Sequence, residues 1–418
     1  MVLQVINSAV FGAGNQFNLG TSDSLWIGRS GLVASTNLTT AILGVGGFQS
    51  VHVEGAVTGG NAIHLGDDPS LDSNALVVVT ATGYVSGEFT GVFINASASR
   101  VVNYGLIESR QIAIELNGTG GGTTRVENAG VVRGGFAGIE AFSSEALTIR
   151  NTGTISSDAF SVRGGGGNDV LRNLGQLFGD VQLNFGNDTY DGRGGSIEGT
   201  IFGNDGNDTF RLGAGVEVVD GGAGIDTLDF RSGGAIRVAL DGSFANTGAA
   251  ADDSYTGIER LFGSSFGNDV LSGNAAANTL MGFGGSDTLG GGAGGDVLIG
   301  GAGADLLTGG AGSDRFVFQS LTEGGDVITD FTSVAGNDDA FRITAAAFGA
   351  GLVAGPLAVF QFQSRADNLA QDADDRFIFR STDATLWFDA NGNLADGLTF
   401  LADLQDGAVL TSADILLV

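Results

Sequence analysis

Between residues 264 and 317 the chain repeats every nine residues, with glycines in front and an acidic residue at a fixed sixth place. The six units read SSFGNDVLS, GNAAANTLM, GFGGSDTLG, GGAGGDVLI, GGAGADLLT and GGAGSDRFV. A large apolar residue stands two places after the sixth position in every unit. Repeats this short are typical of parallel β-solenoids, in which each unit packs only against its neighbours. The period therefore restricts this region to a stack of short coils.

Two such units make one coil, so every unit lies above the second unit that follows it in the sequence. The sixth positions then form two columns on opposite edges of the stack. One column contains Asp269, Asp287 and Asp305, and the other contains Asn278, Asp296 and Asp314. We expect the eighth positions to point inward and fill a narrow core; they are Leu271, Leu280, Leu289, Leu298, Leu307 and Phe316.

The stacked carboxylates predict calcium sites. Parallel strands lie about 4.8 Å apart, and two charges at about 5 Å repel by roughly 3 kcal/mol at an effective dielectric constant of 20. A hard divalent cation removes that repulsion, and calcium takes six to eight oxygen ligands. The glycines allow turn conformations that aim backbone carbonyls at the same ion. A flexible Gly/Asp linker is the alternative interpretation, but it does not explain an apolar residue fixed two places after each acid.

Acidic turns of the same kind precede the regular repeat. The segments GGGGNDVLR, NFGNDTYD, GNDGNDTF and GGAGIDTLD lie between residues 164 and 229. Their sixth positions are Asp169, Asp188, Asp208 and Asp226. We interpret them as further metal ligands in a solenoid that is interrupted at about residues 230–263.

The N-terminal half contains a second repeat, in which an Asn is followed two places later by a Gly and apolar residues flank the pair. It appears as VVNYGLIES, VENAGVVRG, IRNTGTISS and LRNLGQLFG, with gaps of roughly 20 to 28 residues that suit one turn of a parallel β-helix. We expect the coils to shorten along the chain. The motif asparagines should stack as a buried ladder at a turn; they are Asn103, Asn128, Asn151 and Asn173.

Charge follows the acidic repeats. The chain has 418 residues, 18 basic and 47 acidic residues, and a net charge of −29. Residues 1–160 hold 6 Arg and 12 acids, whereas residues 161–418 hold 12 Arg and 35 acids. Such a surface repels nucleic acid and anionic membranes. With no cysteine the chain has no disulfide and no thiolate metal site, and no Sec-type signal peptide or membrane-spanning apolar run is visible.

Residues 221–418 resemble RTX, or haemolysin-type, calcium-binding proteins. Besides the nonapeptides, AADDSYTGIERLFGSSFGNDVLSG resembles the segment that commonly precedes them, and DRFVFQSLTEGGDVITDF resembles the closing segment shared with serralysin-type proteases. The tail from DDRFIFRSTD to the final ILLV resembles an uncleaved type I secretion signal. The resemblance implies that carbonyls of turn glycines join the ligands, namely Gly291, Gly294, Gly300 and Gly303. Asn278 departs from the pattern, which weakens one site. Residues 1–160 look only generally like the β-helices of surface adhesins.

Enzyme classes that often carry such repeats lack their residues here. A zincin needs H-E-x-x-H, but the only histidines are His52 and His64, which alternate with apolar residues as in strands. GSSFG at 263–267 matches the nucleophile-elbow pattern, yet Ser265 lies inside a repeat and no His follows it. A polysaccharide lyase would need a basic group beside clustered acids, which is difficult without lysine. We expect no catalytic activity.

The predicted fold is all-β: a right-handed parallel β-helix that continues into a calcium-binding parallel β-roll, with a C-terminal β-rich capping and secretion region. The expected domains are residues 1–160, 161–317 and 318–418. The expected function is that of a secreted, calcium-binding structural or adhesive protein of the cell surface or extracellular matrix, which self-assembles into filaments or a layer. The alternative is a carbohydrate-active or carbohydrate-binding β-helix exported by its repeats. The expected partners are calcium, a second copy and a surface polysaccharide, with no nucleic acid and no membrane insertion.

Overall fold

The computed structural model describes residues 2–334, 336–394 and 396–418 and is built almost entirely from short strands. It contains two compact units. Unit 1 comprises Met1–Asp226 with Tyr255–Gly257, and unit 2 comprises Thr227–Ser254 with Ile258–Val418. The predicted domain boundaries at residues 160 and 317 stay a prediction.

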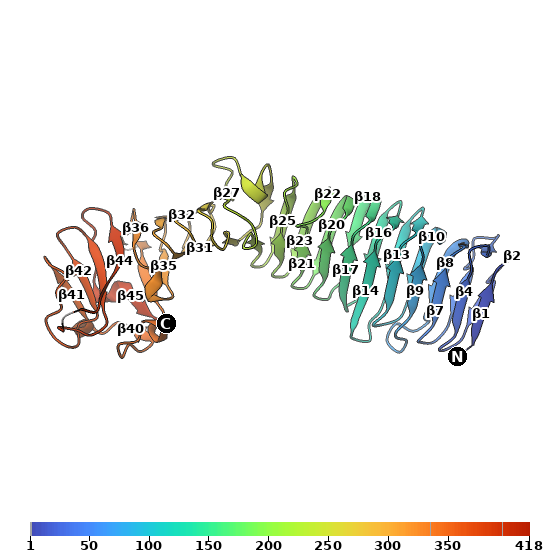
Figure 1. Cartoon of the computed structure of the whole chain (residues 1–418), viewed down its shortest axis with the longest axis horizontal. Coiled ribbons are helices and arrows are strands. Elements are labelled where there is room, and N and C mark those ends of the chain that lie inside the picture. The colour runs from blue at the N-terminus through green and yellow to red at the C-terminus, as the bar shows by residue number, and fades with distance from the viewer. Residues whose placement is uncertain (1, 335, 395) are drawn as a thin grey trace. The chain divides into compact units, whose positions relative to one another are not determined.

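The first sheet of unit 1 contains one strand from each successive coil, and every pairing in it is parallel. Several of these strands stand side by side in Figure 1. In coil order they are β1 (Leu3–Ile6), β4 (Ser24–Ile27), β7 (Ser50–Val53), β9 (Leu76–Val79), β11 (Arg100–Asn103), β14 (Thr123–Asn128), β17 (Ala146–Asn151), β19 (Val170–Asn173), β21 (Thr189–Asp191) and β24 (Thr209–Arg211).

A second parallel sheet is made by the strand that follows in each coil. Its main strands are β2 (Ala9–Gly12), β5 (Leu32–Ser35), β8 (Ala56–Leu65), β10 (Tyr84–Ile94), β12 (Leu106–Ser109), β15 (Val131–Arg133), β18 (Thr154–Arg163), β20 (Gln176–Phe185), β23 (Thr200–Asp205) and β25 (Val218–Ala223). Shorter strands complete it: β3 (Phe17–Leu19), β6 (Ile42–Gly44), β13 (Ile112–Leu116), β16 (Ala137–Ala141), β22 (Ser196–Glu198) and β28 (Ser254–Thr256). This is the predicted parallel β-helix.

From the second coil on, coil length falls along unit 1, as the sequence predicts; the first coil is short, since Leu3 and its register neighbour Ser24 stand 21 residues apart. Ser24 and Ser50 are register neighbours in adjacent coils and stand 26 residues apart, whereas Asp188 and Asp208 in later coils stand 20 residues apart. Alternate residues of the strands point inward, and these side chains are almost fully buried. The period-2 alternation of apolar residues therefore sets which face of each strand enters the core.

The predicted asparagine ladder is confirmed. The Nδ2 of Asn103 donates to Oδ1 of Asn128 at 2.8 Å, and the bond recurs from Asn128 to Asn151 and from Asn151 to Asn173. All four side chains are buried. The glycine two places after each asparagine is required by coil stacking: a Cβ added at Gly153 would lie 2.0 Å from the carbonyl oxygen of Gly130. Only glycine allows that approach.

Unit 2 contains the nine-residue repeats, and its register confirms the coil of two units. Leu271 pairs with Leu289 and Leu289 with Leu307, while Leu280 pairs with Leu298 on the other side. All the predicted inward residues are at most 1% exposed. The strands are β26 (Thr227–Asp229), β29 (Arg260–Phe262), β31 (Thr279–Gly284), β33 (Val297–Ala302), β35 (Arg315–Phe318) and β39 (Ala340–Ile343) on one side, and β27 (Arg237–Ala239), β30 (Val270–Ser272), β32 (Thr288–Ala293), β34 (Leu306–Ala311) and β36 (Asp326–Ile328) on the other.

The interruption of the repeat is also present. Ile236 N donates to Oδ1 of Asp269, which stands 33 residues further along the chain, whereas Asp269 and Asp287 in the following coils stand 18 residues apart. One coil therefore carries an insertion. Because β27 is in register with β30, the additional residues lie between β27 and β29, and they include the 3-10 turn η1 (Gly248–Ala250).

The C-terminal region continues the two sides of the roll and closes its end. Strand β44 (Leu398–Leu404) pairs with β36 and starts an antiparallel group with β43 (Thr385–Asp389) and β42 (Phe377–Arg380). Strand β45 (Ile415–Leu417) pairs with β39. Buried phenylalanine rings of these and the adjoining strands pack against one another, for example Phe316 with Phe341 and Phe377 with Phe388. The tail is thus the predicted β-rich cap.

The remaining elements are small. They are β37 (Ser333–Val334), β38 (Asn337–Asp338), β40 (Gly355–Pro356), β41 (Phe362–Arg365), α1 (Ala345–Phe348), η2 (Leu321–Glu323), η3 (Val359–Gln361) and η4 (Ser412–Asp414). Among the helices that the structure describes, none is long and apolar enough to cross a membrane.

Candidate metal centre

The repeat aspartates of unit 2 form the two predicted columns, and they are joined by hydrogen bonds to the backbone. In each step, Oδ1 of an aspartate accepts the backbone N–H at the sixth position of the preceding coil. Asp269 N donates to Asp287 and Asp287 N donates to Asp305, both at 2.7 Å. In the other column, Asn278 N donates to Asp296 and Asp296 N to Asp314, again at 2.7 Å. One carboxylate oxygen is therefore used to hold neighbouring coils together.

Unit 1 contains a column of the same kind. Asp169 N donates to Oδ1 of Asp188 at 2.6 Å, Asp188 N to Asp208 at 2.7 Å, and Asp208 N to Asp226 at 2.7 Å. Successive members of this column stand 18 to 20 residues apart. The geometry of the nonapeptide turn therefore does not depend on a strict period of nine.

In six of these carboxylates the second oxygen is buried and has no hydrogen-bond partner among the described residues. This holds for Oδ2 of Asp188, Asp208, Asp287, Asp296, Asp305 and Asp314. The side chains are at most 2% exposed. A buried charged oxygen without a partner is strongly unfavourable, so these atoms need a cation or a proton. This shared unsatisfied atom is the strongest sign in the structure of a bound metal.

In five of these six described aspartates, a glycine five places earlier leaves the space beside that oxygen open; the exception is Asp188, which has Leu183 at that place. A Cβ added at Gly282 would lie 2.2 Å from Asp287 Oδ2 and 2.7 Å from the carbonyl oxygen of Gly300. A Cβ added at Gly291 would similarly meet Asp296 Oδ2 at 2.4 Å and the carbonyl oxygen of Gly309 at 2.5 Å. A carboxylate oxygen and a backbone carbonyl of the next coil thus face the same small space. Both are the hard oxygen donors that calcium prefers.

The four glycines predicted as ligands occupy two kinds of position. The carbonyl of Gly300 faces the space beside Asp287, and the carbonyl of Gly291 faces the equivalent space at Gly273, beside Asn278. Gly294 and Gly303 have φ of 115° and 142°, a region open mainly to glycine, and they shape the turn. Their role as ligands stays a prediction. In the described part of the chain no three His, Asp or Glu side chains converge on one point, so a calcium ion here would need backbone carbonyls as well.

Three predicted ligands differ from the others, because the protein itself satisfies their second side-chain atom. Oδ2 of Asp169 accepts Gly165 N at 3.0 Å, and Oδ2 of Asp269 accepts Ser264 N at 2.6 Å. Asn278 accepts Asn274 N through Oδ1 and donates from Nδ2 to the carbonyl of Ile258. All three stand at the first position of a column, where a donor from the protein occupies the place that is left for an ion further along.

Sequence reasoning missed two residues that extend the columns beyond the last repeat. Asp305 N donates to Oδ1 of Asp326, and Asp314 N donates to Oδ1 of Asp339, both at 3.0 Å. Both aspartates are 2% exposed. The available signal was the local pattern of an acid followed two places later by an apolar residue, as in Asp326–Val327–Ile328 and Asp339–Ala340–Phe341. Their separations of 21 and 25 residues from the preceding column members hide them from a search for a nine-residue period.

Hydroxyl groups occupy the equivalent position in the earlier coils of unit 1. Ala75 N donates to Oγ of Ser99 at 3.1 Å, and Ser99 N donates to Oγ1 of Thr124 at 3.2 Å. Leu147 N then donates to Asp169. After Leu147, the acidic column therefore continues a ladder of neutral hydroxyl acceptors.

Burial raises the pKa values of the column carboxylates. Desolvation, together with the neighbouring charges of Asp169 and Asp208, raises the pKa of Asp188 to about 8. Desolvation and the charges of Asp305 and Asp269 raise the pKa of Asp287 to about 7. Without a metal these groups hold protons near neutral pH, and a divalent cation competes with those protons.

Calcium binding should be sensitive to the open space beside Oδ2. In the Gly300→Ala variant the added Cβ would lie 2.3 Å from Asp305 Oδ2, so we expect calcium titration to show at least a ten-fold weaker site, about 1.4 kcal/mol. Gly290→Ala is the matched control, because no atom lies within 4 Å of a Cβ added there. Circular dichroism at saturating calcium checks that both variants fold. Equal calcium midpoints for the two variants would contradict the site.

Stability in chelator should fall as pH rises. The unfolded carboxylates titrate near 3.8 and the folded ones as high as about 8, so the folded state binds more protons between these values. The free energy of unfolding is then highest below about pH 4 and decreases up to about pH 8. Millimolar calcium should restore stability at pH 8, and magnesium should not, because it demands tighter octahedral geometry. The measurement is urea unfolding followed by circular dichroism. A repeat region that is fully and equally stable in chelator at pH 5 and pH 8 would refute it.

Comparison with known proteins agrees with the geometry. The family model of the RTX calcium-binding nonapeptide repeat matches residues 198–228, 263–298 and 290–318. The matched segments contain Asp208, Asp226 and the whole set of six sixth positions from Asp269 to Asp314, while Asp169 and Asp188 lie outside them in the same column. A comparison with curated proteins gives no match. The turns of residues 198–228 and 263–318 are therefore RTX nonapeptide repeats, and the ion that such repeats bind is Ca²⁺.

Proposed function

We propose that this chain is a secreted structural or adhesive protein of the cell surface or extracellular matrix, which calcium holds in its folded form. The observation that carries the proposal is the double use of each column carboxylate. Oδ1 binds the preceding coil, as in the bond from Asp287 N to Asp305, and Oδ2 of Asp305 is left for the ion. An ion held in this way stabilises coil stacking, so its role is structural.

Export through a C-terminal address fits this role. The tail resembles type I secretion segments, and RTX repeats are typical of proteins that leave the cell by that route. In the low calcium of the cytosol, each buried carboxylate has to take up a proton or leave its charge uncompensated, and this cost disfavours folding of the repeats, so the chain can be exported unfolded. Outside, calcium at about 10⁻⁴–10⁻³ M, the range of extracellular sites, completes the fold.

Self-assembly is supported by the first coil of unit 1. Strand β1 pairs with β4 on one side, and within the described residues no strand pairs with its other edge. In the same way β2 pairs with β5 on one side, and no described strand pairs with the other edge of β2. The side chains there are apolar and exposed: Leu3 is 62% exposed and Phe11 61%. Open, uncharged strand edges are sites of strand pairing between molecules. We infer that a second copy pairs with this edge and that copies assemble into a filament or layer.

A non-enzymatic role is part of the proposal. His52 stacks on Trp26, His64 packs against Phe93, and both lie on strands, as predicted. Oγ of Ser265 donates to the carbonyl of Arg231. These contacts give all three side chains structural partners. Incubation with uronate polysaccharides tests the proposal, and the appearance of new unsaturated chain ends would favour the alternative of a carbohydrate-active β-helix.

Assembly should depend on the first coil and on calcium. Deleting residues 2–20 removes β1, β2 and β3, so we expect calcium binding to remain and any polymer to be lost. Analytical ultracentrifugation and electron microscopy with and without calcium measure this. The control is Phe142→Ala, which removes an exposed aromatic ring far from β1 in the sequence. If the intact protein in millimolar calcium sediments only as a monomer of 42.0 kDa at all concentrations, the assembly proposal is wrong.

Export should require the C-terminal tail. Deleting residues 375–418 should retain the protein in the cell, whereas the full-length chain is secreted with its N-terminus uncut. The deletion also removes β44 and β45 from the fold, so a control must separate folding from export. The Gly300→Val/Gly309→Val variant obstructs the column sites but keeps the tail, and it should still be exported. Normal secretion of the truncated chain would refute a C-terminal address.

A further inference from the structure

The outer face of the first sheet in unit 1 begins with an aromatic and apolar patch. Trp26, His52 and Val78 are register neighbours on β4, β7 and β9 and point away from the core. The rings of Trp26 and His52 stack with centroids 4.3 Å apart, and Trp26 remains 38% exposed. A groove of about 330 Å³ runs beside them, bordered by Leu3 and Leu76. Tryptophan exposed on a flat sheet offers a surface for stacking.

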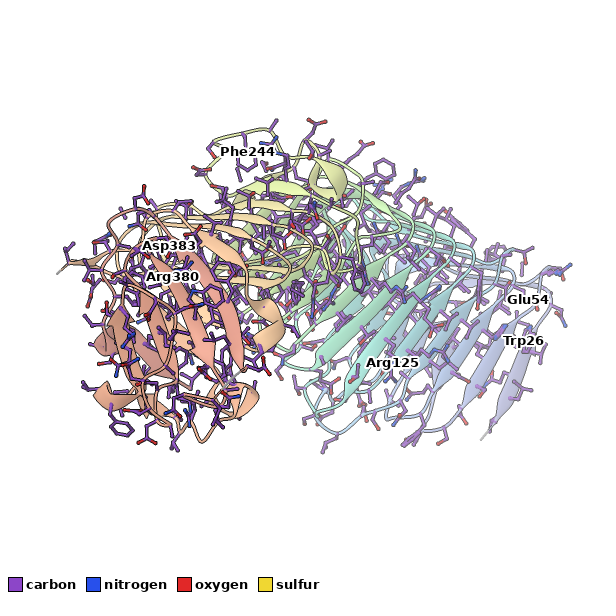
Figure 2. All side chains as sticks on the ribbon, turned by 60° about the vertical axis from the view of Figure 1, so that its left-hand side comes forward. Trp26, Glu54, Arg125, Phe244, Arg380 and Asp383 are labelled. Carbon is purple, nitrogen blue, oxygen red and sulfur yellow. The ribbon has the colours of Figure 1, made fainter. Side chains whose placement is uncertain are left out.

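The same face continues into a strip of arginines, defined here as Arg100, Arg125, Arg150 and Arg172. Arg100 is the register neighbour of Arg125, and Arg150 is the register neighbour of Arg172. In Figure 2 Trp26 and Arg125 lie along this run of parallel strands. Two acids share the face: Arg100 pairs with Glu127 at 2.8 Å, and Arg172 approaches Asp191 at 3.9 Å. Within the described ranges, Arg125 and Arg150 form no ion pair.

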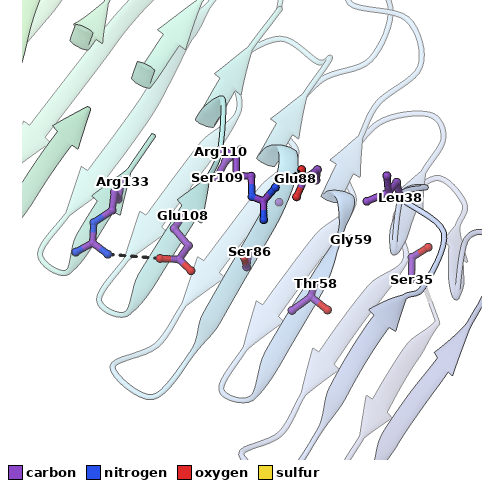
Figure 3. A pocket seen from close by; sticks show the side chains of 11 residues that line it. Ser35, Leu38, Thr58, Gly59, Ser86, Glu88, Glu108, Ser109, Arg110 and Arg133 are labelled. Atoms are coloured by element: carbon purple, nitrogen blue, oxygen red, sulfur yellow. Dashed lines mark hydrogen bonds and ion pairs between the residues drawn. The ribbon is translucent and has the colours of Figure 1, made fainter. Parts of the chain in front are cut away.

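This arrangement is costly for the free protein. Like charges directly opposite each other on neighbouring strands are destabilising. The chain has only 18 basic residues and a net charge of −29, so four arginines on one face are a large share of its positive charge. Elsewhere in unit 1 exposed arginines face glutamates, as Arg110 does Glu88 and Arg133 does Glu108 (Figure 3). Two arginines of the strip, Arg125 and Arg150, therefore lack the ion-pair partners that the other arginines named here have, and an anionic ligand would provide them.

The spacing of the strip points to a polymer with about one charge per unit. The four arginines stand on successive coils, about 4.8 Å apart along the stack, which is close to the length of one sugar residue. Arg150 is displaced by two positions along its strand, because it is in register with Glu127 whereas Arg125 is in register with Thr148. Double-stranded DNA carries one charge per about 1.7 Å, a density that the acidic remainder of this chain would repel. Arginine forks bind planar carboxylates through two hydrogen bonds, and an exposed indole stacks on the apolar face of a pyranose ring.

We propose that the arginine strip and the Trp26–His52 platform together bind a polyuronate, a polysaccharide with one carboxylate per sugar, lying along the coils. This inference rests on the proposed adhesive function and names its target. The polymer carboxylates would neutralise Arg125 and Arg150, and a sugar ring would cover Trp26. The ligand then spans several coils, so affinity comes from many modest contacts on a preformed rigid surface.

The test measures binding of the full-length, calcium-loaded protein to short immobilised oligogalacturonates, which are too short to gel with calcium. The Arg125→Ala/Arg150→Ala variant should bind at least ten-fold more weakly, and Trp26→Ala should also weaken binding. Arg110→Ala/Arg133→Ala is the matched control, because it removes the same charge from ion-paired sites and should bind like the unmodified protein. Binding should fall with added salt, since exposed charge pairs are screened.

Several outcomes would overturn the inference. They are equal binding by the two double variants, equal competition by neutral dextran, or a preference for dextran sulfate, DNA or anionic phospholipid vesicles over oligogalacturonate. Circular dichroism and calcium midpoints should be unchanged in every variant. Because sedimentation tests assembly separately, a protein that assembles but does not bind uronate defeats only this inference. A protein that binds uronate but is neither exported nor assembled defeats only the proposed function.

Discussion

The rest of the structure depends on one interaction, the hydrogen bond from a backbone N–H to an aspartate of the next coil. It fixes one oxygen of each column carboxylate, as between Asp287 and Asp305, and it buries the other where water cannot reach it. A buried carboxylate oxygen must gain a proton or a cation. Folding of the repeats and binding of calcium are therefore one process, because the atoms that stack the coils belong to the groups that hold the ion.

The coils of unit 1 that carry hydroxyl groups in place of the aspartates show how stacking proceeds without an ion. Ser99 and Thr124 accept the equivalent backbone N–H groups through neutral hydroxyls, and the nearby carboxylate of Glu145 accepts from Thr124. We expect coils built in this way to need no ion, whereas the buried carboxylates from Asp188 onward need a cation or a proton. Ca²⁺ thus acts on one part of the chain and leaves the first coils folded on hydrophobic packing and on the asparagine ladder. A surface that has to persist when calcium varies, such as the arginine strip, lies mainly on those first coils.

Charge is divided in the same way. Most acidic residues belong to the repeats and the cap, where calcium can offset them, while the arginine strip lies on the outer face of the first sheet. An acidic molecule with one cationic strip resists unspecific association and still presents a defined surface to a polyanion of low charge density. Specificity of this kind comes from where the few positive charges stand and not from their number.

The sequence by itself determined the solenoid, the coil of two nonapeptides, the two columns and the inward leucines, because a fixed period turns sequence spacing directly into spatial neighbours. It also predicted the asparagine ladder, since each Asn is placed two residues before a glycine that coil stacking demands. Only the tertiary structure decided which ligands have an oxygen to give: Asp169 and Asp269 look like the others in sequence, but turn N–H groups occupy their second oxygen. It also added Asp326 and Asp339, whose loops differ in length from the repeat, and it placed Trp26 and Arg125, which are distant in the sequence, on one face of the same sheet. These features depend on how turns of unequal length superpose, and a local pattern does not contain that information.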